Sequence, residues 1–72
     1  MTNNDILRRL RYALDFGDDK MIAVFAEGGL EVDRAQVSNW LKKEEDPAHV
    51  MCHDTALATF LNGLIIERRG RR

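Results

Sequence analysis

The clearest helix start in this 72-residue sequence lies in the stretch Val32-Asp33-Arg34-Ala35-Gln36-Val37-Ser38-Asn39-Trp40-Leu41-Lys42-Lys43. Asp33 has a side chain that accepts hydrogen bonds from the first backbone N–H groups of a helix, and Gln36 follows at the third position, as in a capping box. The apolar residues that recur at helical spacing and are predicted to face the core are Val37, Trp40 and Leu41. The stretch therefore predicts a short amphipathic helix that begins after Asp33 and ends near Lys43.

The sequence before this stretch predicts two further helices. The first extends from about Asn3 to Asp15, and Thr2 and Asp5 have the spacing of a capping box at its start. The second has its N-cap at one residue of the pair Asp18-Asp19. It ends at Gly28-Gly29, because glycine adopts the left-handed conformation of a helix end at little cost.

The sequence after this stretch predicts a polar connector, an irregular segment over residues 48–53 and a last helix. Asp54 is the predicted N-cap of that helix, and Gly70 lies near its end. Its apolar stripe is predicted to consist of Leu57, Phe60, Leu61, Leu64 and Ile65. Its basic end consists of Arg68, Arg69, Arg71 and Arg72.

The pattern is helical throughout and shows no strand alternation, so the predicted fold is all-α. A chain of this length has room for one hydrophobic core, which predicts a single domain over residues 1–72. We expect a small four-helix domain with a corner like that of a helix-turn-helix. The predicted core residues are Leu7, Leu10, Leu14, Ile22, Phe25, Val37, Trp40, Leu41, Leu57, Leu61 and Leu64.

The composition excludes several classes of protein. There are 11 Lys and Arg residues against 12 Asp and Glu, so a net charge of −1 argues against non-specific binding to nucleic acid. One cysteine excludes an internal disulfide and fits a reducing compartment. No apolar run reaches the roughly 20 residues of a membrane span, and the first residues do not resemble a signal peptide. The expected location is the cytoplasm.

The second and third predicted helices, joined by a glycine-containing turn, suggest a helix-turn-helix that binds DNA. The residues that would contact DNA are Ala35, Ser38, Asn39, Lys42 and Lys43. Asn39 would read adenine, and the lysines would contact phosphate. The linker is longer than the usual turn of 3–4 residues, and the acidic run Glu44-Glu45-Asp46 follows directly. An ordinary helical corner is therefore the preferred interpretation, and DNA binding is the alternative.

His49, Cys52 and His53 are the residues that would carry metal or thiol chemistry. Their spacing matches no common zinc pattern, and no second pair of ligands occurs elsewhere. The helix that follows Cys52 would lower the pKa of its thiol, and a neighbouring histidine would act as its base. A polar loop before a capped helix accounts for the same residues. We therefore expect no metal, no cofactor, no small-molecule substrate and no enzymatic activity.

Two residues of the last helix suggest contact with a partner. Ile66 lies opposite the predicted apolar stripe, among polar residues. Gly63 interrupts the helix at a cost of about 1 kcal/mol relative to alanine, and it would permit the close approach of another helix. The candidate self-association residues are Thr59, Asn62, Gly63 and Ile66. An isolated exposed isoleucine and a tolerated glycine are the alternative explanation.

Several motifs resemble the YehS-like family, an uncharacterised group of bacterial proteins. They are the run Thr2-Asn3-Asn4-Asp5-Ile6-Leu7-Arg8-Arg9-Leu10-Arg11-Tyr12-Ala13-Leu14, Asp18-Asp19-Lys20-Met21, Gly28-Gly29, Val37-Ser38-x-Trp40-Leu41-Lys42-Lys43-Glu44 and Phe60-Leu61-Asn62-Gly63-Leu64-Ile65. The resemblance covers nearly the whole chain. It implies no activity and no catalytic residue. It also implies that members hold two similar copies of this unit in tandem, whereas this chain holds one.

The leading hypothesis is a non-enzymatic binding module that forms a homodimer or pairs with a second copy of the same unit. A surface that meets the second copy in longer members would be left open here, and symmetric self-association is its simplest replacement. The alternative hypothesis is a DNA-binding domain that uses the helix over residues 33–43.

Overall fold

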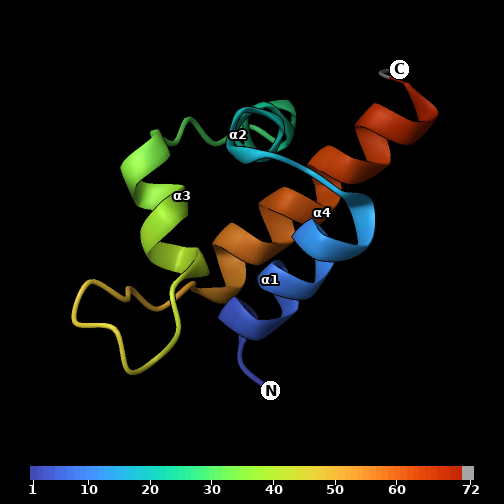
Figure 1. Cartoon of the computed structure of the whole chain (residues 1–72). Helices are drawn as coiled ribbons and strands as arrows, with labels where there is room; N and C mark the ends of the chain where they lie inside the picture. The colour runs from blue at the N-terminus through green and yellow to red at the C-terminus, as the bar shows by residue number, and fades with distance from the viewer. Residues whose placement is uncertain (71–72) are drawn as a thin grey trace.

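Four helices make up most of the chain in a computed structural model that describes residues 1–70 (Figure 1). The helices are α1 (Asn3–Leu14), α2 (Asp18–Glu27), α3 (Arg34–Leu41) and α4 (Asp54–Arg69). Residues 1–70 contain no strand, which confirms the predicted all-α fold. No helix in this part of the chain is long and apolar enough to cross a membrane. The last two arginines of the predicted basic end, Arg71 and Arg72, lie outside the described residues.

The longest helix, α4, is the element against which α1 and α2 both pack. Helices α1 and α4 run side by side in the same direction, with their starts close together (Figure 1). A hydrogen bond of 2.6 Å from Asn3 to Asp54 joins the two starts. Helix α3 packs against α1 and α2, and residues 42–53 lead back from its end to the start of α4.

The core is centred on Phe25 of α2. The ring centroid of Phe25 lies 5.3 Å from that of Trp40 on α3 and 4.9 Å from that of Phe60 on α4. The other fully buried apolar side chains are Leu7, Met21, Val24, Val37 and Cys52. Most of the predicted core is confirmed, since the following residues are buried or packed against it: Leu7, Leu10, Ile22, Phe25, Val37, Trp40, Leu41, Leu57 and Leu64.

Two predicted helix starts are confirmed. The hydroxyl of Thr2 accepts a hydrogen bond from the backbone N–H of Asp5 (3.1 Å), and the Asp5 carboxylate accepts one from the Thr2 N–H (3.0 Å). These two bonds form the capping box of α1. The carboxylate of Asp33 accepts a hydrogen bond of 2.7 Å from the backbone of Gln36 and caps α3.

The other two predicted N-caps are wrong by one residue. Gly17 precedes α2 and His53 precedes α4, so Asp18 and Asp54 lie in the first turns of these helices. A carboxylate in the first turn is still stabilised by the positive end of the helix dipole. Both side chains also have partners elsewhere: Asp18 pairs with arginines of α1 and α3, and Asp54 accepts a hydrogen bond from α1.

The ends of α2 and α3 differ in how well they were predicted. Gly29 has φ +102°, and the N–H of Leu30 donates to the carbonyl of Phe25 (3.0 Å). This is a Schellman motif, and it confirms the end predicted at Gly28-Gly29. Helix α3 ends at Leu41, earlier than predicted, because Lys42 is extended and its carbonyl accepts a hydrogen bond from Arg8 instead of continuing the helix.

The buried face of α4 differs from the predicted stripe. It consists of Ala56, Phe60 and Gly63. A methyl group added at Gly63 would overlap the backbone carbonyl of Val24, so this glycine allows α2 to lie directly against α4. Because small residues form this contact, two of the large apolar residues of the predicted stripe face away from the core. Leu61, predicted to be in the core, is 40% exposed, and Ile65 of the predicted stripe is 56% exposed.

Candidate functional site

The exposed side of α4 presents apolar residues to solvent. Leu61 and Asn62 lie three and four residues after Ala58, and Ile65 lies four and three residues after them, so all four residues share one face of the helix. All four are exposed, and this set is called the α4 outer face below. Large apolar side chains that adjoin one another on a helix are candidates for an interface with another protein.

Two of the four candidate self-association residues, Thr59 and Gly63, lie against another part of the same chain. Gly63 is buried, and the helix that approaches it is α2 of the same chain. Thr59 lies against Gly28, the residue that follows α2, where an added methyl group would overlap the backbone carbonyl of Thr59. Gly63 therefore lies under α2 and is not part of an open surface of the single chain.

Ile66 and Asn62 are four residues apart, so they adjoin on one side of α4, but they differ in exposure. Ile66 is half-buried. Gly63, three residues before it, abuts α2, and the carboxylate of Glu67, which follows it, forms an ion pair with Lys20 of α2. Asn62 is exposed and belongs to the α4 outer face. Of the four candidates, Asn62 is therefore the one that is exposed, and it belongs to the surface that the structure leaves uncovered.

Three of the predicted DNA-contacting residues, Ala35, Ser38 and Asn39, lie on α3, and Lys42 and Lys43 follow its end. Ala35 and Lys43 are exposed, whereas Ser38, Asn39 and Lys42 are half-buried. The Lys42 ammonium donates a hydrogen bond of 2.9 Å to the Ser38 hydroxyl. A lysine that is held by its own helix is less available to a phosphate.

The surroundings of α3 further reduce its suitability for DNA. Arg34 at its start forms ion pairs with Asp18 (3.6 Å) and Asp19 of α2. Near its end, the backbone N–H of Val50 donates to the carbonyl of Asn39 (3.2 Å), so the connecting segment lies against this helix. The acidic run that follows α3 is exposed, and it places negative charge directly after the lysines that would contact phosphate.

Cys52 is buried rather than exposed at the start of α4. Burial raises the pKa of the Cys52 thiol above its ordinary value, and the neighbouring Asp54 carboxylate raises it further. The expected lowering by the helix dipole is therefore wrong, and the thiol is protonated at neutral pH. Within residues 1–70, no three side chains of His, Cys, Asp or Glu come together as they would around a metal ion.

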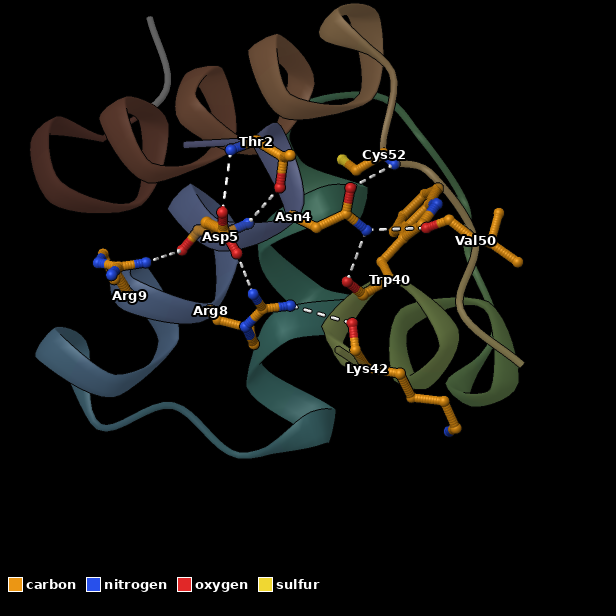
Figure 2. Close-up of polar contacts among 9 residues, drawn as sticks. All are labelled: Thr2, Asn4, Asp5, Arg8, Arg9, Trp40, Lys42, Val50 and Cys52. Atoms are coloured by element: carbon orange, nitrogen blue, oxygen red, sulfur yellow. Dashed lines mark hydrogen bonds and ion pairs between the residues drawn. The ribbon is translucent and has the colours of Figure 1, made fainter. Parts of the chain in front are cut away.

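A polar cluster at the start of α1 was missed by the sequence analysis (Figure 2). Asn4 is only 1% exposed. Its amide nitrogen donates to the carbonyls of Trp40 and Val50, both at 2.8 Å, and its oxygen accepts from the backbone N–H of Cys52 at 3.0 Å. One side chain thus ties α1 to the end of α3 and to the segment before α4.

Neighbouring residues of α1 extend this polar cluster. Arg8 donates to the carbonyl of Lys42 (3.0 Å) and forms an ion pair with Asp5 (Figure 2). The hydrogen bond from the Thr2 backbone and the charge of Arg8 hold the pKa of Asp5 below its ordinary value. Apart from the Asp5 carboxylate, the partners of Asn4 and Arg8 are backbone groups of the chain itself, so the arrangement fixes the connecting segment in place.

One signal in the sequence could have identified Asn4. It lies three residues before the core residue Leu7, and therefore on the apolar side of α1. A polar residue at such a position is either a helix-start residue or a buried hydrogen-bonding group. The capping box at Thr2 favoured the first interpretation.

Comparison with known proteins agrees with the resemblance noted in the sequence. The family described as "Protein of unknown function (DUF1456)" matches residues 3–70. The chain belongs to this family. The "Uncharacterized protein YehS" of Escherichia coli (strain K12), a relative of this DUF1456 chain, is 41% identical over 71 residues. The match covers 99% of the chain and 46% of that relative. The chain therefore spans about half the length of this curated relative. No solved structure matches this chain.

Proposed function

We propose that this chain is a non-enzymatic helical module that pairs with a second copy of the same unit through the α4 outer face. The observation that carries the proposal is the exposure of Leu61 and Ile65 on one side of α4. The opposite side of the same helix packs tightly against α2. A second unit would bury the two apolar side chains and would gain about 25 cal/mol for each Å² of apolar area removed from water.

The length of the relative supports pairing between two such units. YehS of Escherichia coli is matched over 46% of its length by nearly the whole of this chain. What remains of YehS is long enough for a second unit of the same size. A chain with one unit would then form between molecules the contact that a longer member forms within one molecule.

The buried Cys52 supports a role without catalysis. Its thiol is shielded from solvent and protonated at neutral pH, so it lacks the thiolate that nucleophilic chemistry requires. The proposal therefore assigns binding, and no reaction, to the chain.

DNA binding through α3 is not adopted as a second proposal. The cations at Arg34 and Lys42 are engaged by groups of the same chain, and the residues after α3 are acidic. Binding to DNA depends on cations that are free to neutralise phosphates. A salt-dependent shift of a DNA duplex that is lost in Lys42→Ala would reverse this preference.

The first test is the mass of the protein in solution. Sedimentation velocity from micromolar to millimolar concentration should show an equilibrium between monomer and dimer. The change Ile65→Glu should raise the dissociation constant at least tenfold, because it places a charge in an apolar contact. Tyr12→Glu is the matched control, since Tyr12 is an apolar ring that is 89% exposed on α1.

The outcomes of this test are distinct. A wild-type monomer at every concentration would overturn the proposal. A dimer that is weakened equally by Ile65→Glu and Tyr12→Glu would show that the interface is not the α4 outer face. Circular dichroism should show the same helical content for all three proteins, because both changed positions are exposed.

A further inference from the structure

We infer that the two copies pair through antiparallel α4 helices centred on Leu61, with Asp54 of each copy opposite Arg68 of the other. This inference rests on the proposed pairing and specifies its geometry. The residues that carry it form one line along the exposed side of α4, called the α4 seam below: Asp54, Ala58, Leu61, Ile65 and Arg68.

The spacing along the α4 seam is that of a helix that faces another helix. Successive members are separated by four, three, four and three residues, which is the heptad pattern of coiled-coil contacts. All five side chains are exposed. The three central positions are apolar, and the small Ala58 leaves room for the side chain of a facing helix.

The charges at the ends of the seam select the antiparallel direction. Asp54 is in the first turn of α4 and Arg68 is in the last turn. In a parallel pair, each charged residue would meet its own copy, and like charges would repel at both ends. In an antiparallel pair centred on Leu61, Asp54 and Arg68 lie equally far from the centre on opposite sides. Asp54 of each copy therefore meets Arg68 of the other copy. The helix dipoles are also opposed in that arrangement.

The position of α1 favours the same direction. The starts of α1 and α4 are joined by the hydrogen bond from Asn3 to Asp54, and both helices run toward the C-terminal end of α4 (Figure 1). Antiparallel α4 helices bring the end of α4 in one copy close to the start of α1 in the other. Two units in one longer chain could then be joined by a short connector.

The symmetry of this arrangement limits it to two copies. The same surface is used by both partners about a two-fold axis through Leu61, so the contact closes on itself and does not continue into a filament. Once all molecules are paired, a further increase in protein concentration should produce no species larger than a dimer.

Charge reversal tests the antiparallel direction. Arg68→Asp should raise the dissociation constant about tenfold, because it replaces two attractive contacts by two repulsive ones. The double change Asp54→Arg with Arg68→Asp should restore dimerisation, because it exchanges the two charges. Dimerisation that is unaffected by Arg68→Asp would overturn the inference. Helical content by circular dichroism monitors folding, since Asp54 also accepts a hydrogen bond from Asn3.

Cross-linking tests the direction with variants that retain Asp54. A short bis-maleimide should cross-link the dimer of Leu61→Cys, because two copies of this residue lie at the two-fold axis. It should fail with Arg68→Cys, since two copies of that residue would lie about 21 Å apart along the helix axes. The native Cys52 is buried and does not compete. Efficient cross-linking of Arg68→Cys would show parallel helices and overturn the inference.

Failure of the inference can be distinguished from failure of the proposed function. A wild-type chain that stays monomeric refutes the pairing itself. A wild-type dimer that is weakened by Ile65→Glu, but is indifferent to Arg68→Asp, retains the pairing and refutes the antiparallel geometry.

Discussion

A single buried amide at Asn4 holds three backbone groups, and its hydrogen bonds to two of them, the Trp40 carbonyl and the Cys52 N–H, are buried. The change Asn4→Ala removes all three hydrogen bonds and leaves the partner groups partly shielded from water. We expect it to lower the free energy of unfolding by about 3 kcal/mol, since one unsatisfied buried polar group costs roughly 1–3 kcal/mol. Urea denaturation measures the effect. Gln36→Ala, which truncates an exposed amide on α3, is the control and should cost less than about 0.5 kcal/mol.

The capping box at the start of α1 should make stability depend on pH in the acid range. The folded-state pKa of Asp5 is below its ordinary value, so the folded chain binds this proton less readily than the unfolded chain. The contribution of Asp5 is therefore fully present above about pH 4, where the unfolded carboxyl ionises, and is lost as the pH falls toward the folded pKa. Urea midpoints between pH 6 and pH 2 should fall less steeply in Asp5→Asn than in the wild type. Parallel curves would contradict the prediction.

Residue types alone could identify Thr2 and Asp33 as caps, because a cap depends on a few neighbours in the sequence. They could not identify Asn4 or Arg8 as the residues that hold residues 42–52. Their partners are backbone carbonyls and N–H groups far along the chain. Backbone groups exist at every position, so no residue type marks a particular one as the partner.

The contact between α2 and α4 can be tested by Gly63→Ala, because an exposed glycine and a glycine under another helix predict opposite changes in stability. On an exposed helix face, Gly63→Ala would stabilise the protein by about 1 kcal/mol, because alanine is the better helix former. The added methyl group would instead overlap the carbonyl of Val24, a backbone atom that cannot move aside cheaply. We expect a destabilisation of about 2–3 kcal/mol, measured by thermal or urea unfolding. Asn62→Ala on the α4 outer face is the exposed control, and a stabilised Gly63→Ala would contradict this packing.

The orientation of α4 was the part of the fold that the pattern of residues predicted least well. Periodicity places Leu57, Leu61 and Leu64 on one side, and two of these do pack against the core. Periodicity gives no weight to a glycine, although α2 and α4 approach each other closely at Gly63. The surface available for pairing is set by that contact. The outer face therefore became visible only when α2 and α4 were placed together, and Leu61 moved from the predicted core to the predicted interface.

At the scale of the whole molecule, pairing couples stability to concentration. A dimer that dissociates on unfolding gains stability with protein concentration, because the partner acts as a ligand of the folded state. The unfolding temperature of the wild-type chain should therefore rise with concentration. When two copies are joined end to end in one chain, pairing is intramolecular. It then depends on a fixed effective concentration and not on the concentration of the protein.

A covalent tandem of two copies tests this coupling together with the geometry of the pair. With a short connector between residue 70 of one copy and residue 1 of the next, the unfolding temperature should be independent of concentration and higher than that of the dilute single chain. The antiparallel α4 contact predicts this result because it brings these two ends together, whereas a parallel contact separates them by about the 24 Å length of a 16-residue helix. Ile65→Glu in both halves is the control. It should return the tandem to the unfolding temperature of the single chain at high dilution, and a tandem that is indifferent to this change would place the contact elsewhere.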